Sequence, residues 1–390
     1  MKHIFDKRSF PRRRIRIGLD LKSNNQSIKA EIIDLNPFGL MAQLDGPLNI
    51  GQAVNLGFMF SSKPFYNEAK VVWVNVAPRD KDKNCRWEAG FEFTKISQDW
   101  FDRIDSFLSL KKINRIVILT LDSLYSNIAL RKIIKEFSDK ISLICLSERF
   151  SKRRGSMVKQ TLNNLKDSGL LFVVYSSFYV ILHNFFIRLL RWFSVHLFRR
   201  ASGVYTIEEI AKQYVIPVIE TDAINSERVL KRMKNIEPEL IISCHFDQRV
   251  RNPMLEIPKY GAINLHYALL PEFRGPFPTF WALKQGKDRV GVTVHFMNEK
   301  LDEGDIVHQQ EAKVRAGDSV LSLNCRLLNI GAELIIKAIR KIEYDVLEKV
   351  SQQDIGIGTY HSYPKKQNIR EFTRKRAKLF SLRHYLKNLS

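Results

Sequence analysis

The chain has 390 residues, of which 45% are hydrophobic and 27% charged, and its formal net charge at pH 7 is +22. This composition excludes an intrinsically disordered chain and a collagen-like fibre, because enough apolar side chains are present to form a core. At about 150 residues per domain, the length predicts two or three domains.

Residues 1–110 are predicted to form a small antiparallel β-barrel. Six runs rich in β-branched and aromatic residues are separated by clusters of Asn, Pro, Gly, Lys and Asp, which is typical of strands joined by turns. The runs are IRIGLDL, KAEIIDL, LMAQL, AVNLGFMF, AKVVWVNVA and WEAGFEF. Residues 98–110 then carry apolar side chains at helical spacing, so we expect a short helix to close this domain.

Residues 113–345 are predicted to form an α/β domain of the Rossmann-like type, interrupted by a helical insert at about 150–205. Buried strands alternate with amphipathic helices, as in a parallel sheet, and the helix GAELIIKAIRKI closes the domain. Residues 346–390 form a basic C-terminal extension. The expected fold is therefore multidomain, a β-barrel followed by an α/β domain.

Residues 170–187 contain no charged side chain over 18 positions, which is long enough for a transmembrane helix. Two observations argue against a transmembrane helix. The segment contains two serines, a histidine and an asparagine, and it interrupts a domain whose two halves must meet on one side of a bilayer. Two other interpretations stay open: an interfacial amphipathic helix with cationic flanks, and a helix packed in the core or between subunits.

The positive charge is concentrated in two stretches. Residues 147–200 carry ten Lys or Arg against two Asp or Glu, and residues 351–390 carry nine against two. Both stretches are candidate surfaces for phosphate-rich or membrane partners, with solvated helix faces as the alternative.

The four cysteines form no Cys-x-x-Cys pair, and the first residues have no apolar h-region of a signal peptide. We therefore expect a cytoplasmic protein, which could also contact the inner membrane peripherally.

The N-terminal domain presents a candidate anion-binding constellation. Arg8 and Arg12 form an R-x-x-x-R arm before the first strand, and Asp34, Asn36 and Gly39 form a D-x-N-x-x-G turn after the second. Two guanidinium groups can bind phosphates and guanine edges, and the carboxylate and amide can accept from guanine N–H groups. A solvated N-terminal arm is the alternative for the arginines.

Together with the VVWV and GFEF strands, these motifs make residues 5–110 resemble the PilZ domain, a small β-barrel that binds cyclic di-GMP. The resemblance implies cyclic di-GMP as a regulatory ligand, contacted by Arg8, Arg12, Asp34, Asn36 and Gly39. The family usually has serine at the position of Asn36. Some members have lost the ligand and act as protein-interaction modules, which is the alternative for this domain.

A second constellation lies in the α/β domain. Asn264 and His266 stand two residues apart at the end of a predicted strand, so they leave the same face of the sheet, and Asp302 follows a later strand. An amide donor, an imidazole and a carboxylate suit acyl transfer to an amine. The alternative is a polar strand end beside a solvated acidic loop.

With the ALLPEFRG segment and the LDEGD loop, residues 236–310 resemble the formyltransferases that use N10-formyltetrahydrofolate. The resemblance implies Asn264, His266 and Asp302 as the catalytic set and no metal. It also implies two segments that contact the folate. They are Phe246, Asp247, Gln248, Arg249 and Val250, and Ala268, Leu269, Leu270 and Pro271, with alanine where the family has serine. His295 either faces the cleft or is packed in its strand.

The resemblance predicts a folate-dependent formyltransferase whose acceptor is a small amine. A nucleotide-linked amino sugar is the preferred acceptor, and cyclic di-GMP is the predicted regulator. Methionyl-tRNA formyltransferases carry a large C-terminal barrel, whereas about 45 residues follow the closing helix here, so tRNA is kept as an alternative acceptor. A catalytically idle effector that senses cyclic di-GMP and binds partners is the alternative from another class.

Overall fold

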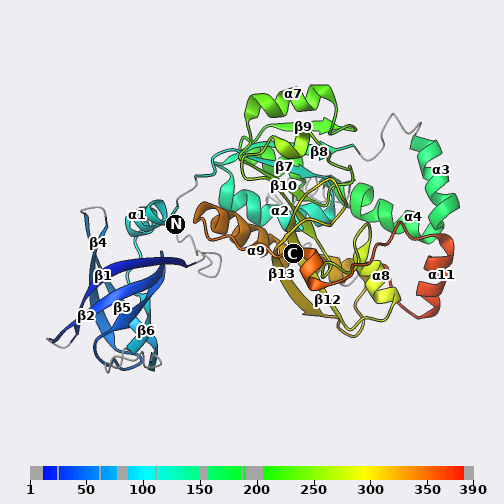
Figure 1. Cartoon of the computed structure of the whole chain (residues 1–390). Helices are drawn as coiled ribbons and strands as arrows, with labels where there is room; N and C mark the ends of the chain where they lie inside the picture. The colour runs from blue at the N-terminus through cyan, green and yellow to red at the C-terminus, as the bar shows by residue number, and fades with distance from the viewer. Residues whose placement is uncertain are drawn as a thin grey trace. The chain divides into compact units, whose positions relative to one another are not determined.

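The computed structural model describes residues 12–23, 26–60, 63–76, 87–109, 112–148, 157–185, 188–189 and 205–381. By their contacts the residues divide into two compact units, shown in Figure 1. The first unit comprises residues 1–112 together with Ile339–Leu347, and the second comprises Ile113–Ala338 and Glu348–Ser390.

The first unit is a closed six-stranded barrel in which every strand pairing is antiparallel. The strands are β1 (Arg13–Ser23), β2 (Gln26–Asn36), β3 (Gly39–Leu44), β4 (Ala53–Phe60), β5 (Lys63–Val76) and β6 (Trp87–Phe93), and they close in the order β1-β2-β3-β6-β5-β4. The barrel expected from the sequence is therefore confirmed.

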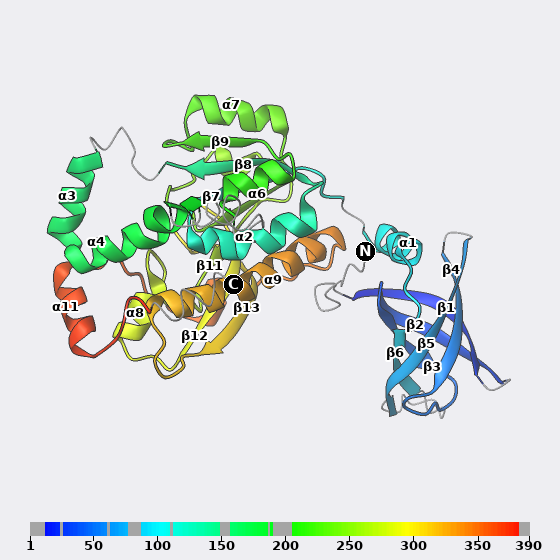
Figure 2. The same cartoon turned by 180° about the vertical axis from the view of Figure 1, so that it is seen from behind.

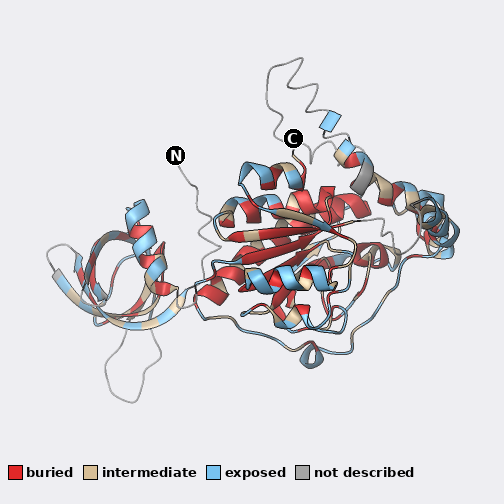
Figure 3. Ribbon diagram, turned by 90° about the horizontal axis from the view of Figure 1, so that it is seen from above, coloured by how far each residue is buried: buried red, intermediate tan, exposed pale blue. Residues whose placement is uncertain are grey.

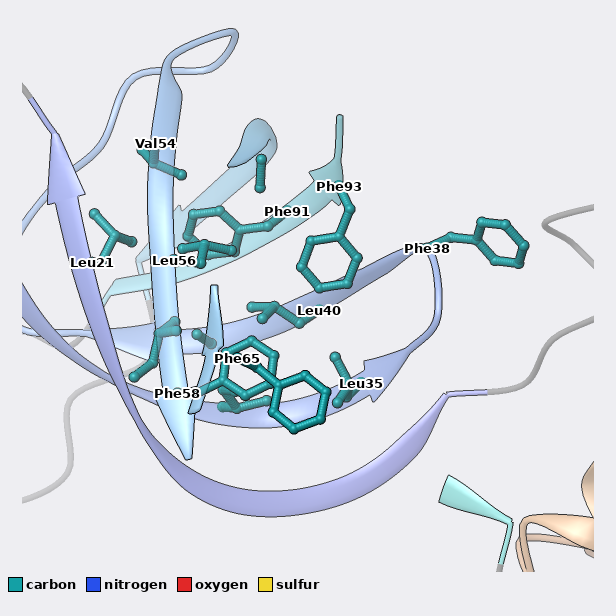
Figure 4. Close-up of a cluster of buried hydrophobic side chains, with 14 of the residues drawn as sticks. Leu21, Leu35, Phe38, Leu40, Val54, Leu56, Phe58, Phe65, Phe91 and Phe93 are labelled. Atoms are coloured by element: carbon teal, nitrogen blue, oxygen red, sulfur yellow. The ribbon is translucent and has the colours of Figure 1, made fainter. Parts of the chain in front are cut away.

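The barrel core consists of the side chains that alternate inward along each strand, and Figure 4 shows them meeting from all six strands. Helix α1 (Gln98–Leu108) begins after Ser97, whose side chain caps the first turn, and it buries Trp100 against the rings of Phe58 and Phe93. Tyr344, more than 200 residues away in sequence, is fully buried in the same core and donates a hydrogen bond to Asp105.

The second unit contains a seven-stranded mixed sheet in the order β13-β12-β11-β10-β7-β8-β9. Its strands are β7 (Ile116–Thr120), β8 (Ile141–Ser147), β9 (Val218–Thr221), β10 (Leu240–Cys244), β11 (Ala262–His266), β12 (Arg289–Phe296) and β13 (Ile306–Lys313). The pairings among the first five strands are parallel, as expected, whereas β12 pairs antiparallel with both of its neighbours, β11 and β13. The connection from β12 to β13 is too short for the crossover that parallel strands need.

Helices cover both faces of this sheet, and Figure 3 shows the strands buried between them. The helices of this unit outside the insert are α2 (Leu124–Phe137), α6 (Ile207–Gln213), α7 (Glu227–Ile236), α8 (Pro278–Lys284), α9 (Val320–Glu343), α10 (Gln352–Ile355) and α11 (Lys366–Arg374), with the 3-10 turn η4 (Met254–Glu256), as far as the structure describes the chain. Helix α7 packs on the face that carries Ala262, and α9 packs on the face that carries Leu265. Helix α9 begins at Val320, earlier than the closing helix expected from the sequence, because apolar side chains continue at helical spacing toward its N-terminus.

The insert forms α3 (Met157–Ser168), α4 (Leu170–Ser177) and the π-helical turn η3 (Phe178–Leu182), seen beside α11 in Figures 1 and 2. Phe172, Tyr175, Tyr179 and His183 are buried, and the hydroxyls of Tyr125 and Tyr175 lie 2.7 Å apart. Within the described residues, no helix is both long and apolar enough to cross a membrane. The segment at 170–185 therefore has one face packed in the domain, while 186 and 187 lie outside the described residues.

Candidate functional site

The candidate site lies where β11 ends, beside the loop that follows β12. Asn264 and His266 project from the same face of β11, as their two-residue spacing predicts. Because β11 and β12 pair antiparallel, Asn264 lies directly opposite His295. The loop after β12 brings Asp302 to the same place, so residues separated by nearly 40 positions form one cluster.

His266 is buried between a carboxylate and a carbonyl. Its Nε2 lies 2.9 Å from the backbone oxygen of Phe273, and its Nδ1 lies 3.7 Å from Oδ2 of Asp302. A carbonyl oxygen only accepts hydrogen bonds, so Nε2 donates and carries a proton. A further proton therefore enters the ring at Nδ1, where the Asp302 carboxylate stabilises the resulting imidazolium.

Asp302 is held in its ionised form. Burial alone disfavours the charge, but His266, His295 and the N–H of Gly275 outweigh it and hold the pKa of this carboxyl well below its usual range. Gly275 N donates to Oδ2 at 2.8 Å, and His295 Nε2 lies 3.6 Å from Oδ1. The backbone of Asp302 has a φ of 55°, a left-handed conformation that aspartate tolerates better than most residues.

Asn264 lies within reach of the same cluster. Its side-chain amide nitrogen is 3.1 Å from Nε2 of His295, and His295 Nδ1 donates to the oxygen of Phe296 at 2.7 Å. The sequence left two alternatives for His295, a side chain that faces the cleft or one that is packed in its strand. In the structure His295 is buried in β12 and contacts two members of the cluster. The register of an antiparallel pair decides this, and no local pattern reports it.

Gln352 buttresses the cluster from the C-terminal extension, which sequence reasoning missed. Its side-chain nitrogen donates to the oxygens of Asp302 and Gly304 at 2.9 and 2.8 Å, and its oxygen accepts from Arg274 at 3.1 and 3.2 Å. Gln352 is buried although it follows a short polar stretch. It therefore ties the acidic loop to the segment that follows Pro271.

Side-chain hydrogen bonds hold the two segments that are expected to contact folate. In the segment 246–250, Gln248 is fixed by bonds to Ile224 N, Ser147 and Thr221 O, and Arg249 bonds to Glu299 O. In the segment 268–271, the hydroxyl of Thr293 donates to Ala268 O and accepts from Leu270 N. The described part of the chain contains no group of three His, Cys, Asp or Glu side chains arranged to hold a metal ion.

The barrel brings together part of the arginine and turn constellation. Arg12 donates to Oδ1 of Asp34 at 2.8 Å. The side-chain oxygen of Asn36 accepts from the N–H groups of Phe38 and Gly39 at 2.9 and 3.0 Å, so it stabilises the turn between β2 and β3. A Cβ at Gly39 would lie 2.2 Å from the backbone oxygen of Phe91, so β6 requires glycine there. Arg8 lies outside the described residues.

Asp122, in the loop between β7 and α2, gives the second unit a testable pH dependence. Burial raises its pKa to about 6, while the N–H of Ile207 and the charge of Arg188 lower it and Glu208 and Glu209 raise it. The folded state therefore binds the proton more tightly than the unfolded state. The free energy of unfolding consequently falls as the pH rises from about 4 to about 6.

We expect Asp122→Asn to be more stable than the wild type above about pH 6, by up to about 2 kcal/mol, because asparagine still accepts from Ile207 and carries no charge. The difference should vanish toward about pH 4. Denaturant unfolding across this range measures it. Burial lowers the pKa of His183 to about 4, but that contribution is common to both proteins and cancels. A difference that does not change with pH would contradict the assignment.

Family models match residues in both units. The family model described as PilZ domain matches residues 6–109, and the one described as Formyl transferase matches residues 201–339.

The curated relatives match less than half of the chain. Methionyl-tRNA formyltransferase of Bacillus mycoides is 35% identical over 164 residues, which are 42% of this chain and 52% of the relative. The corresponding enzyme of Halothermothrix orenii is 31% identical over 176 residues, 45% of this chain and 56% of the relative. The chain thus spans about half the length of the curated relatives it matches.

Solved structures show more distant similarity. A phosphoribosylglycinamide formyltransferase from Anaplasma phagocytophilum has 18% identity and a TM-score of 0.42, covering 64% of this chain and all of that one. A sugar N-formyltransferase from Shewanella sp. has 16% identity and a TM-score of 0.41, covering 71% of this chain and 87% of that one.

Proposed function

For a chain that joins a PilZ domain to a formyl transferase domain, we propose that the second unit transfers a formyl group from N10-formyltetrahydrofolate to an amine. The observation that carries this proposal is the meeting of Asn264, His266 and Asp302 at one end of β11. These three groups supply an amide donor, a proton acceptor and a charge that supports the protonated acceptor.

The reaction needs a proton acceptor and an oxyanion donor. The amine attacks the formyl carbon, and the carbonyl oxygen gains negative charge, which the amide N–H of Asn264 stabilises. The amine nitrogen loses a proton to Nδ1 of His266, while Asp302 stabilises the imidazolium. Collapse of the intermediate breaks the bond to N10, and the proton passes to that nitrogen, which leaves the histidine neutral.

The acceptor that we propose is a nucleotide-linked amino sugar. Exposed basic side chains at the C-terminal end of the second unit suit a phosphorylated acceptor, and they include Lys365, Lys366, Arg370, Arg374, Lys375, Arg376 and Lys378. Methionyl-tRNA is the second candidate, favoured by the relatives that match this unit. Both acceptors carry a primary amine and phosphates, so the site chemistry is the same.

We also propose that the barrel binds cyclic di-GMP and thereby regulates the second unit. Arg12, Asp34, Asn36 and Gly39 lie together at the end of the barrel where β1 pairs with the last residues of β2. An idle effector that only binds partners is the rival, and the assembled catalytic cluster argues against it.

Formyl transfer by the wild-type protein tests the proposal. The full chain is incubated with N10-formyltetrahydrofolate and, in separate reactions, with nucleotide amino sugars or methionyl-tRNA, and folate release and the formylated product are measured. Cyclic di-GMP is then added to the reaction that gives a formylated product, and the rate is measured again. Product from a single acceptor class identifies the substrate. Absence of folate binding and of product with every acceptor would reject the enzyme and leave the effector.

A further inference from the structure

The described part of the insert exposes a largely aliphatic set of side chains along one side of its helices, called the aliphatic face below. Five side chains recur at helical intervals of three, eight, three and four residues and are exposed. They are Leu171 (49%), Val174 (53%), Leu182 (39%), Phe185 (59%) and Leu189 (38%). Leu170 and, on α3, Val158 and Leu162 are exposed as well. Solitary apolar side chains on a surface are ordinary, but a continuous apolar face marks an interaction site.

The helix that carries this face is firmly packed on another side. Phe172, Tyr175 and Tyr179 are buried, and the ring of Tyr179 stacks on that of Tyr125 in α2, with 4.7 Å between the ring centroids. Phe172 also packs against Phe277 at the start of α8, with the ring centroids 4.8 Å apart. The aliphatic face is therefore presented by an anchored helix.

Basic side chains border the aliphatic face. Helix α11 packs against α3, and Figures 1 and 2 show both beside α4. The side chain of Lys366 lies against Gly169, the residue that precedes α4. Lys366, Arg370 and Arg374 follow one another at intervals of four and are exposed, while Ile369 and Phe372 on the inner side of α11 are buried.

Acidic side chains do not balance this charge. Among the described residues, α3 carries Lys159 and Lys166 against Asp167, and the one acid of α11, Glu371, pairs with Lys284 of α8. An aliphatic face bordered by excess cations is complementary to a bilayer with anionic headgroups, because the acyl region takes the leucines and the headgroups pair with the lysines and arginines. A surface that binds a protein partner typically has more aromatic side chains and fewer lysines than this one.

We propose that the face formed by α3, α4, η3 and α11 rests on an anionic membrane surface. The helices lie in the plane of the interface and do not span it. This contact does not depend on the formyl transfer proposed above.

Flotation of the full chain with vesicles tests the proposal. Vesicles of phosphatidylcholine alone are compared with vesicles that also contain phosphatidylglycerol, and we expect binding to rise at least tenfold with the anionic lipid and to fall as salt is raised. Val174→Glu and Leu182→Glu place charge on the aliphatic face and should lower binding at least tenfold. Ile50→Glu is the matched control, since Ile50 is an exposed apolar side chain of the barrel (69%) and should leave binding unchanged.

A second pair of variants keeps the test decisive if the first pair folds poorly. Lys366→Glu and Arg370→Glu reverse two exposed charges on α11 and should lower binding to the anionic vesicles but not alter the circular dichroism spectrum. Wild-type protein that does not float with anionic vesicles overturns the proposal. So does sedimentation of the wild type as a dimer that Val174→Glu dissociates, because a second copy would then cover the face.

Discussion

Replacing His266 by alanine is expected to lower the turnover number for formyl transfer by about 10² to 10⁴-fold, because the substitution removes the group that accepts the amine proton. The affinity for the folate should change little, because the proton moves only during the reaction. Steady-state kinetics with the acceptor that gives product in the assay proposed above, together with direct folate binding, measure both quantities.

Two further variants separate the roles within the cluster. Asn264→Ala should cost about 10² to 10³-fold in turnover through the lost oxyanion donor. Asp302→Asn keeps the size of the side chain and an acceptor for Gly275 N but withdraws the charge that supports an imidazolium at His266. Its effect should fall on turnover more than on folate affinity.

His308→Ala serves as the control, since His308 is another histidine of the same sheet and its strand register pairs it with Val294, which is not a member of the cluster. If His266→Ala retained wild-type turnover, or lost no more than His308→Ala, the assignment of the proton acceptor would be wrong. If the three cluster variants lost folate binding in parallel with turnover, the cluster would serve to bind the folate and not to catalyse the transfer.

Arg12→Ala is expected to weaken cyclic di-GMP binding by about 10 to 100-fold, because each charge-assisted hydrogen bond to a ligand phosphate contributes about 1.5 to 3 kcal/mol. Calorimetric titration of the full chain measures the affinity. The full chain is required because Tyr344 completes the core of the barrel and would be absent from a fragment that ends near residue 110.

Lys70→Ala is the control for this titration, because Lys70 is an exposed cation of the same barrel on β5. Loss of the Arg12 side chain also frees Asp34 from its ion pair, but an exposed pair contributes little to stability, so the barrel should remain folded. Equal affinity of the wild type and Arg12→Ala would remove this arginine from the ligand site. Absence of binding by the wild type would favour the interaction module.

The sequence alone determined the features that depend on neighbouring residues. Runs of β-branched and aromatic residues separated by turn-forming residues predicted the six barrel strands, and the change to strands alternating with amphipathic helices predicted the second fold. Both patterns depend only on residues that are close together in the chain. The two-residue spacing likewise placed Asn264 and His266 on one face of β11. Their functional roles remain proposals, since they came from resemblance to a family.

Only the tertiary structure decided the features that depend on distant residues. Asp302 meets His266 through the loop after β12, His295 joins them through antiparallel register, and Gln352 ties the loop down from the C-terminal extension. The insert at 170–185 illustrates the same limit, because a stretch without charges has the same composition whether it spans a membrane or packs against α2. The burial of Tyr175 against Tyr125 shows that one face of this helix packs in the domain. Packing between residues far apart in the chain leaves no local sequence pattern, so the sequence could not predict it.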